Sequence, residues 1–225
     1  MPENRFKAVI WDLDGVIADT APYHFKAWQE VFSKRGVDYS EEDFKRNFGQ
    51  TNDTIIGDIL GGNVPQNEAD NIANEKEVNY RQKAAHNIKP LPGAIELMRV
   101  LSEYGVKMAI ASSTPMENIQ LITGGLGINS CFQAIVSGDE VAEGKPNPQV
   151  FLLAAQKLGV ESHSCIVIED AIAGVAAAKR AEMKCLAVTN THPRASLKEA
   201  DLVVDKLDSV GLKDLKALFN SWTVS

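Results

Sequence analysis

The sequence contains little cysteine, and the few cysteines present do not suggest a disulfide framework. Cys131, Cys165 and Cys185 are odd in number, lie far apart and show no CxxC spacing. This pattern argues against both disulfide bonds and a cysteine metal site. We therefore expect the three thiols to act as small apolar side chains of the core.

Long apolar runs and an excess of basic residues are also lacking. No stretch approaches the roughly 18 consecutive apolar residues of a membrane span, and the first residues, MPENRFK, lack the apolar core of a signal peptide. The formal net charge of −7, without a long basic run, argues against nucleic acid or an anionic membrane as the partner. With 44% hydrophobic residues, the 225-residue chain can bury a substantial core. We expect a cytoplasmic, monomeric globular protein.

The first apolar segment of the chain runs directly into two aspartates. Residues 6–11 are almost continuously apolar, which is typical of a strand covered on both faces. Side chains alternate along an extended backbone, so Asp12 and Asp14 can point into one small space, where two like charges need a cation. Gly15 permits a sharp exit from the strand. The alternative is that these aspartates only cap a strand-to-helix turn.

The segment after the aspartates shows only helical and turn patterns. Residues 22–35 carry apolar side chains at helical spacing, and Asp19 or Thr20 is available as the N-terminal cap. Further short helices are expected up to about residue 88, so the segment predicts an all-helical insert. The sequence PLPG at 90–93 then punctuates the chain as a hinge would.

Strands and helices alternate regularly after this hinge. The expected strands are 106–111, 134–137, 165–168, 185–188 and 202–204, and the expected helices are 94–104, 116–124, 148–158, 172–181 and 212–219. This alternation predicts βαβ units, a parallel sheet and a three-layer, Rossmann-like α/β fold. We assign residues 1–19 and 91–225 to this α/β core, and residues 20–90 to a small all-helical domain inserted after the first strand.

Polar residues follow the apolar part of three expected strands. They are Asp12 with Asp14, then Ser112, Ser113 and Thr114, and finally Glu169 with Asp170. In a parallel sheet the carboxyl ends of the strands lie along one edge, where ligands bind in this class of fold. We therefore expect the three groups to converge, although a lone Ser or Thr after a strand is usually only a cap.

The same residues resemble the four motifs of the haloacid dehalogenase-like superfamily, most of whose members are phosphatases. DLDGV at 12–16 resembles motif one, Ser112 after VKMAIA motif two, Lys145 in EGKPNPQVF motif three, and IEDAIAG motif four. The resemblance implies that Asp12 is the nucleophile and Asp14 the general acid/base. It also implies that Ser112, with nearby groups, holds the phosphoryl group and that Lys145 pairs with the nucleophile and the phosphate. Alone, a lysine before a helix is normally a solvated charge.

A magnesium site is a further implication of this resemblance. Mg²⁺ prefers oxygen ligands, and a phosphate ester repels an attacking carboxylate unless cations neutralise its oxygens. The family pattern makes Asp12 and Asp170 carboxylate ligands, Asp14 a main-chain carbonyl ligand, and Glu169 the residue that completes or orients the set. Asp12 would form an aspartyl phosphate while protonated Asp14 donates to the leaving oxygen. Water or a sugar hydroxyl as second acceptor then distinguishes a phosphatase from a mutase.

The helical insert lies where the family has its helical cap, and DTAPYHFKAW resembles the β-phosphoglucomutase-like branch. In that branch the positions of His24 and Lys76 help to bind the substrate and couple cap closure to the chemistry. The alternatives are packing beside Trp28 for His24 and a solvated helix face for Lys76. Together with Tyr23 and Asn52, these two residues are expected to choose the substrate.

Three positions depart from the mutase pattern. The mutase holds its second phosphate with an Arg in the cap and with a Lys and an Asn after motif two, positions that fall here on Asn52, Pro115 and Met116. Losing cationic contacts should weaken the hold on a bisphosphate. We therefore expect a phosphatase acting on a small phosphorylated metabolite, such as a sugar phosphate. A phosphomutase is the alternative, and a non-catalytic phospholigand-binding protein is less favoured. The cap is expected to move about linkers at 19–22 and 88–92.

Overall fold

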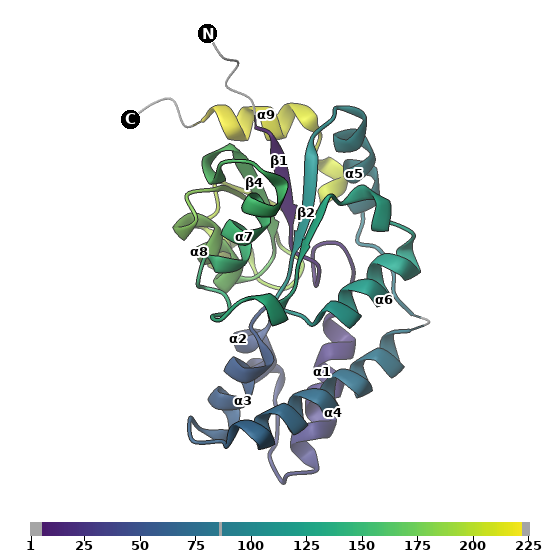
Figure 1. Cartoon of the computed structure of the whole chain (residues 1–225), viewed down its shortest axis with the longest axis vertical. Coiled ribbons are helices and arrows are strands. Elements are labelled where there is room, and N and C mark those ends of the chain that lie inside the picture. Colours follow the sequence, from purple (N-terminus) through teal and green to yellow (C-terminus); the bar gives the residue numbers. More distant parts are fainter. Residues whose placement is uncertain (1–5, 86, 222–225) are drawn as a thin grey trace.

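The computed structural model describes residues 6–85 and 87–221, and it places a parallel sheet at the centre of the molecule (Figure 1). The strands are β1 (Ala8–Trp11), β2 (Lys107–Ala111), β3 (Ala134–Val136), β4 (Cys165–Glu169), β5 (Lys184–Val188) and β6 (Leu202–Val204). Their order is β3-β2-β1-β4-β5-β6, and every pairing is parallel. The chain builds outwards on both sides of β1, so the reversal of strand order lies beside β1, where this class of fold binds ligands.

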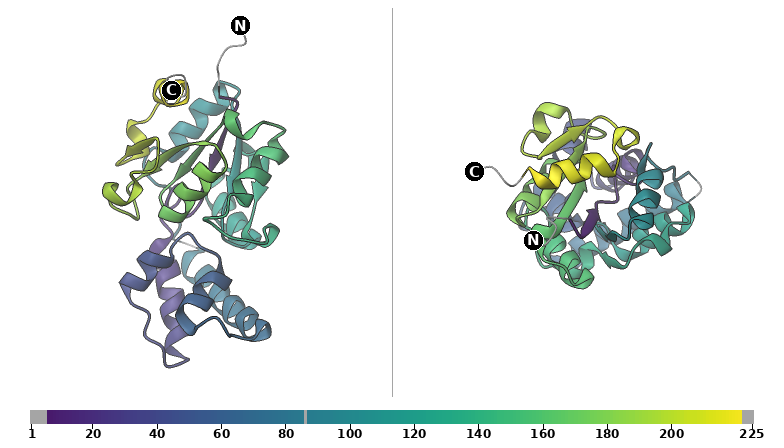
Figure 2. Two further views of the ribbon diagram at one scale, coloured as in Figure 1. Left: turned by 90° about the vertical axis from the view of Figure 1, so that its left-hand side faces the viewer. Right: turned by 90° about the horizontal axis from the view of Figure 1, so that it is seen from above.

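Helices cover both faces of the sheet, as Figure 2 shows. They are α5 (Ala94–Glu103), α6 (Met116–Leu126), α7 (Gln149–Leu158), α8 (Ile172–Arg180) and α9 (Leu212–Asn220). Val9 and Trp11 of β1 belong to the apolar cluster that includes α5, α6 and α9. Ala8 and Ile10 belong to the cluster that includes α7 and α8. The alternation along β1 thus separates two fully buried layers, and the three-layer α/β prediction is confirmed.

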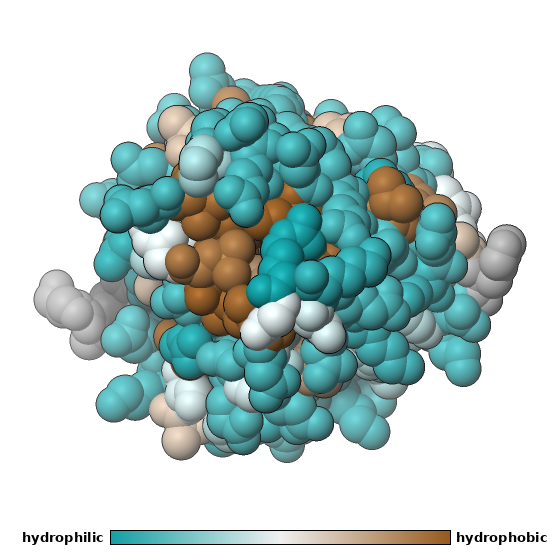
Figure 3. Space-filling model, turned by 90° about the horizontal axis from the view of Figure 1, so that it is seen from below, coloured by the Kyte–Doolittle hydropathy of each residue, from teal (hydrophilic) through white to brown (hydrophobic). Residues whose placement is uncertain are grey.

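Among the described residues between β1 and α5, the regular elements are all helices. They are α1 (Ala21–Ser33), α2 (Glu41–Asn47), α3 (Asn52–Leu60) and α4 (Gln66–Ala84). These helices have their own apolar cluster, which includes Trp28, Phe32 and Ile72. Figure 1 places them at the end of the sheet opposite the chain termini. Seen from that end, polar side chains surround a central apolar area (Figure 3). The expected all-helical insert after the first strand is therefore present.

The two connections to this insert run side by side. Ala18 and Pro90 form an antiparallel bridge, and the backbone N–H of Asp19 donates to the carbonyl of Lys89 at 3.2 Å. The insert is therefore attached through one short paired ribbon and not through two independent tethers. Such an attachment suits a hinge, because few other backbone bonds need to break when the two parts separate.

Small differences from the sequence predictions concern the core and the strand ends. Cys165 and Cys185 are buried as expected, whereas Cys131 is only half-buried; all three are free thiols. Glu169 is the last residue of β4 and pairs in register with Ala187, so the strand extends one residue beyond the predicted end. Within the described residues, no helix is long and apolar enough to cross a membrane. Residues 1–5, on which much of the signal-peptide prediction rests, lie outside the described part.

Candidate active site

A buried ammonium group joins two carboxylates at the carboxyl end of β1. Lys145, from the loop before α7, places its Nζ 2.7 Å from Asp12 Oδ1 and 2.7 Å from Glu169 Oε1. The side chains of Lys145 and Glu169 are fully buried, and that of Asp12 is 4% exposed. The three side chains come from points of the sequence that only the parallel sheet brings together. The family-like residues therefore form one contact network.

A third carboxylate completes an acidic cluster around this network. Asp12, Glu169 and Asp170 each offer an oxygen, and these atoms lie within 4.8 Å of one another. The Thr191 hydroxyl donates to Asp170 Oδ2, whereas Asp170 Oδ1 is buried and has no hydrogen-bond partner among the described residues. Lys145 contacts two of these three carboxylates, those of Asp12 and Glu169, so one ammonium faces a cluster of three acidic groups. An orphaned oxygen and surplus negative charge are the features that a divalent cation with oxygen ligands would satisfy, so these residues fit Mg²⁺.

Burial and mutual repulsion perturb the protonation of this cluster. Burial raises the pKa of Asp12 to about 7, although the Lys145 ammonium opposes the change. Burial and the charges of Glu169 and Asp12 raise the pKa of Asp170 well above its ordinary value. Burial alone would lower the pKa of Lys145, but the neighbouring carboxylates raise it. A divalent cation would reverse this balance and favour the ionised carboxylates.

Asp14 faces a different set of groups. Its Oδ1 accepts a hydrogen bond from the Thr20 hydroxyl at 2.5 Å and lies 3.1 Å from His24 Nε2. Lys76 Nζ lies 3.0 Å from His24 Nδ1, and because an ammonium can only donate, Nδ1 accepts and Nε2–H donates to Asp14. The His24 ring stacks on Tyr80 with centroids 3.9 Å apart. Burial alone would raise the pKa of Asp14, but these partners together hold it below its ordinary value.

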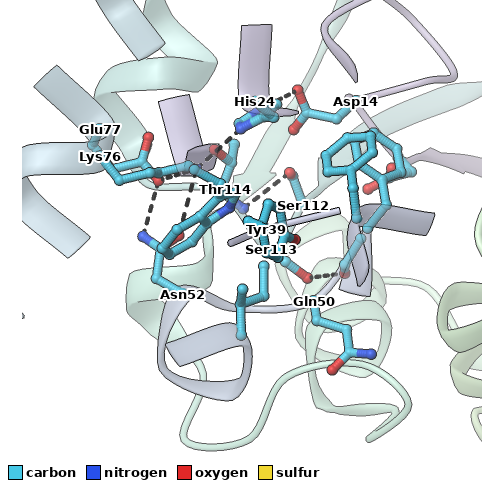
Figure 4. Close-up of a pocket in the computed structure, with 16 residues that line it drawn as sticks. Asp14, His24, Tyr39, Gln50, Asn52, Lys76, Glu77, Ser112, Ser113 and Thr114 are labelled. Carbon is cyan, nitrogen blue, oxygen red and sulfur yellow. Dashed lines mark hydrogen bonds and ion pairs between the residues drawn. The ribbon is translucent and has the colours of Figure 1, made fainter. Parts of the chain in front are cut away.

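The pocket between the sheet edge and the helical insert is small. Figure 4 shows its lining, to which the core contributes Asp14 and Ser112 to Thr114 and the insert contributes residues such as Asn52 and Lys76. Its cavity has a volume of about 40 Å³, which is room for only a few water molecules. The Ser113 hydroxyl crosses the boundary and donates to the carbonyl of Gly49 at 2.8 Å. A phosphate ester is larger than this cavity.

Most predicted site residues meet at this pocket, and a few lie elsewhere. Tyr23 does not line it; its hydroxyl donates to the carbonyl of Asn87 at 3.2 Å. Pro115 borders a neighbouring cleft, and the backbone N–H of Met116 donates to Asp139. The Asp14 carboxylate is directed at His24 and Thr20 and is not one of the clustered carboxylates, so a metal contact from its main-chain carbonyl remains a prediction.

Sequence reasoning missed several polar residues of the site. Thr20 was expected as a possible helix cap and as the downstream Thr of motif one, without a contact to Asp14, yet its side chain makes no cap hydrogen bond and turns to Asp14. Glu77, beside Lys76, was not singled out, although its carboxylate lines the pocket. Thr191 lies in a loop after β5 and has no motif to mark it. The only signal for Glu77 in the sequence was its place as an acidic residue next to a predicted site lysine.

The fold, the acidic cluster and the paired lysine together define a class of enzyme. A model of the haloacid dehalogenase-like hydrolase family matches residues 6–182, and the chain belongs to this family. The family membership predicted from the four motifs is therefore confirmed.

Two proteins with similar sequences have different named activities, one as a mutase and the other as a phosphatase. The chain is 35% identical over 215 residues to a β-phosphoglucomutase of Bacillus subtilis, covering 92% of each protein. It is 33% identical over 186 residues to a fructose-1-phosphate phosphatase of Escherichia coli, covering 82% of this chain and 97% of the relative. A crystal structure of β-phosphoglucomutase from Clostridium difficile superimposes with a TM-score of 0.90 at 30% identity, covering 98% of this chain and 100% of that one.

A longer protein contains a similar segment. The chain is 34% identical over 221 residues to Protein SUPPRESSOR OF QUENCHING 1, chloroplastic, of Arabidopsis thaliana. The match covers 94% of this chain but only 21% of that protein. This chain therefore spans about one fifth of the length of that relative.

Proposed function

We propose that the protein is a magnesium-dependent phosphatase that hydrolyses a small phosphorylated metabolite through an aspartyl phosphate on Asp12. The observation that carries the proposal is the arrangement around one small pocket. Lys145 lies 2.7 Å from Asp12 on one side, and Asp14 is bound by Thr20 and His24 on the other. A nucleophile and an acid/base therefore sit on neighbouring residues with separate partners.

The two aspartates have environments suited to different tasks. The Lys145 ammonium opposes the effect of burial on Asp12 and can also neutralise a phosphoryl oxygen. Asp14 is held by groups that reach it partly from the insert, since His24 lies on α1 and Lys76 on α4. Movement of the insert would change these contacts and hence the pKa of Asp14. We propose that closure in this way completes the acid/base.

Asp12, Glu169 and Asp170 are the side chains that would hold Mg²⁺. The ion would supply charge neutralisation to the phosphate oxygens, which otherwise repel the attacking carboxylate. The Ser112 hydroxyl, which accepts from the backbone N–H of Thr114 at 3.2 Å, stands ready to donate to the phosphoryl group.

The helical insert would act as a cap formed by residues 20–90, on a core of residues 1–19 and 91–225. Because the 40 Å³ pocket cannot admit an ester, we propose that the cap opens about the linkers at 19–22 and 88–92. In a Cys131→Ser background, a cleavable bismaleimide between Arg81→Cys on α4 and Glu117→Cys on α6, two positions that line the same cleft, should stop turnover, and cleavage should restore it. Full turnover in the cross-linked protein would contradict cap opening. A cytoplasmic location and a monomeric state remain predictions.

The decisive experiment follows two products at once. The protein is incubated with Mg²⁺ and β-glucose 1-phosphate, primed with a trace of the 1,6-bisphosphate, and then with a wider panel of sugar phosphates. Free phosphate and glucose 6-phosphate are measured together, with Asp12→Asn as control. Release of phosphate by the wild type, and not by Asp12→Asn, supports the phosphatase function. Rapid isomerisation without phosphate release would establish the mutase, the function of the Bacillus subtilis relative, in its place.

A further inference from the structure

A buried carboxylate of the insert occupies the boundary between the two parts of the molecule. Glu77, on α4, is 4% exposed. Its Oε1 lies 2.7 Å from Lys76 Nζ and accepts from Asn52 Nδ2 at 2.9 Å. Its Oε2 accepts from Asn118 Nδ2, on α6 of the core, at 2.6 Å. Every one of these three donors could otherwise bind an anion that entered the site.

Glu77 also separates two spaces. It lines the small pocket next to Asp14, and it lines an adjoining, larger cleft of about 470 Å³. Asn52 and Ser113 are shared by both spaces in the same way, so these three residues form the wall between them. Figure 4 shows Glu77 beside Lys76 on the side of the pocket that faces Thr114. A substrate that places its phosphate beside Asp12 must extend past this wall.

The adjoining cleft carries more negative than positive groups. Asp53, Glu117 and Asp139 line it in addition to Glu77, whereas its basic side chain is Arg81. The Arg81 guanidinium is itself engaged, donating to Asn118 Oδ1 at 3.1 Å. A dianionic phosphate in this cleft would therefore meet like charges and find its nearest donors already committed. Hydroxyl groups, in contrast, can donate to carboxylates without such a penalty.

We propose that Glu77 determines substrate specificity. Its own carboxylate occupies the position between Lys76, Asn52 and Asn118 in which an anionic group of a substrate could otherwise bind. The substrate is then a phosphomonoester whose distal end is uncharged and rich in hydroxyl groups, and a second phosphate is rejected. Lys76 pairs with this carboxylate and also contacts His24 Nδ1 at 3.0 Å, so its ammonium is already engaged by groups of the protein when a second phosphate approaches. The inference rests on the proposed phosphatase function and adds the class of its substrate.

The test compares pairs of sugar phosphates that differ by one phosphate. The kcat/KM for phosphate release is measured for fructose 1-phosphate and glucose 6-phosphate, and for fructose 1,6-bisphosphate and glucose 1,6-bisphosphate. The wild type should prefer each monophosphate at least ten-fold. In Glu77→Gln the preference should fall by roughly ten-fold, because charges a few ångströms apart at an effective dielectric constant of about 20 change binding by at least that factor. Glu77→Asp should keep the wild-type preference.

Glu75→Gln is the matched control. Glu75 lies on the same helix, pairs with Lys34 and Arg35, and lines neither of the two spaces, so the preference should not change. If Glu77 only ties the insert to the core, Glu77→Gln will lower both rates equally, and this result would overturn the inference.

The wild-type measurement alone is also decisive if Glu77→Gln fails to fold. Equal kcat/KM values for a monophosphate and its bisphosphate would overturn the specificity role while leaving the phosphatase intact. Absence of phosphate release from every ester, with Mg²⁺ present, would instead overturn the proposed function, and the inference with it.

Discussion

Replacing Lys145 by methionine tests the physical basis of the site directly. The substitution Lys145→Met keeps an unbranched apolar chain but removes the ammonium that lies 2.7 Å from both Asp12 and Glu169. The variant leaves these carboxylates buried without their cation. Because breaking a buried ion pair on one side costs about 3–5 kcal/mol, we expect a loss of that size in the free energy of unfolding at neutral pH.

A surface lysine provides the matched comparison. Lys157 pairs with Glu140, but both side chains are about one third exposed. Exposed ion pairs contribute about 0–1 kcal/mol, so Lys157→Met should cost no more than that. Urea unfolding of both variants and the wild type, in the presence of EDTA, measures the difference.

The effect of Lys145→Met should depend on pH in a definite direction. In the wild type, burial raises the pKa of Asp12 to about 7, and Lys145 opposes this rise. Without the ammonium, the pKa of Asp12 must rise further. A carboxyl group whose pKa is higher in the folded than in the unfolded protein contributes stability below the unfolded pKa, and that stability is lost as pH rises through the folded pKa. The deficit of the variant should therefore grow between pH 6 and pH 9.

Added Mg²⁺ supplies the second part of this test. An ion that binds only the folded protein stabilises it by mass action. Because Lys145→Met leaves the acidic cluster with a larger charge surplus, Mg²⁺ should restore more stability to this variant than to the wild type. A loss no greater than that of Lys157→Met, or a deficit that shrinks as pH rises, would refute the proposed balance of charges.

Two further predictions concern packing and acid stability. In Gly174→Ala, the new Cβ would lie 1.7 Å from Glu169 Oε1 and displace this carboxylate, so we expect a loss of about 1–3 kcal/mol. In Gly125→Ala the new Cβ meets no atom within 4 Å, so the free energy of unfolding should rise by up to about 1 kcal/mol. Urea unfolding curves that move in the same direction for both glycine variants would contradict this reasoning. Burial alone would raise the pKa of Asp201, but hydrogen bonds from two lysines and a backbone N–H hold this pKa below its ordinary value. The Asp201 carboxylate therefore stabilises the folded protein above its unfolded pKa, and this stabilisation is lost as pH falls through its folded pKa. Asp201→Asn should therefore cost about 1–2 kcal/mol at pH 7 and much less near pH 3, whereas exposed Asp38→Asn should cost little at either pH; an equal loss at both pH values for Asp201→Asn would count against the argument.

Local patterns were sufficient to predict the core of the fold and the centre of the site. The alternation of short apolar runs with helical segments predicted the parallel sheet because strands buried on both faces need continuous apolar sequence. Asp12 and Asp170 each come directly after an apolar strand. Because the strands are parallel, both aspartates must lie at the same edge of the sheet. Lys145 was predicted through its motif, and its contact with Asp12 then depends on the loop before α7.

The boundary between the core and the insert could not be predicted in the same way. Thr20 stands where a helix cap is expected, but its hydroxyl bonds to Asp14 because the linker brings the two side chains together. Glu77 and Asn118 are 41 residues apart, on helices of different parts of the molecule.

The sequence by itself therefore determined the α/β fold, the helical insert and the residues with family-like roles, because these depend on periodicity and on strand direction. Only the tertiary structure decided which of the insert's polar residues face the pocket. Their partners are set by how two separately packed apolar cores dock against each other, and the contacts across such a boundary leave no regular spacing in the sequence. Glu77, the residue proposed to choose the substrate, belongs to this second group.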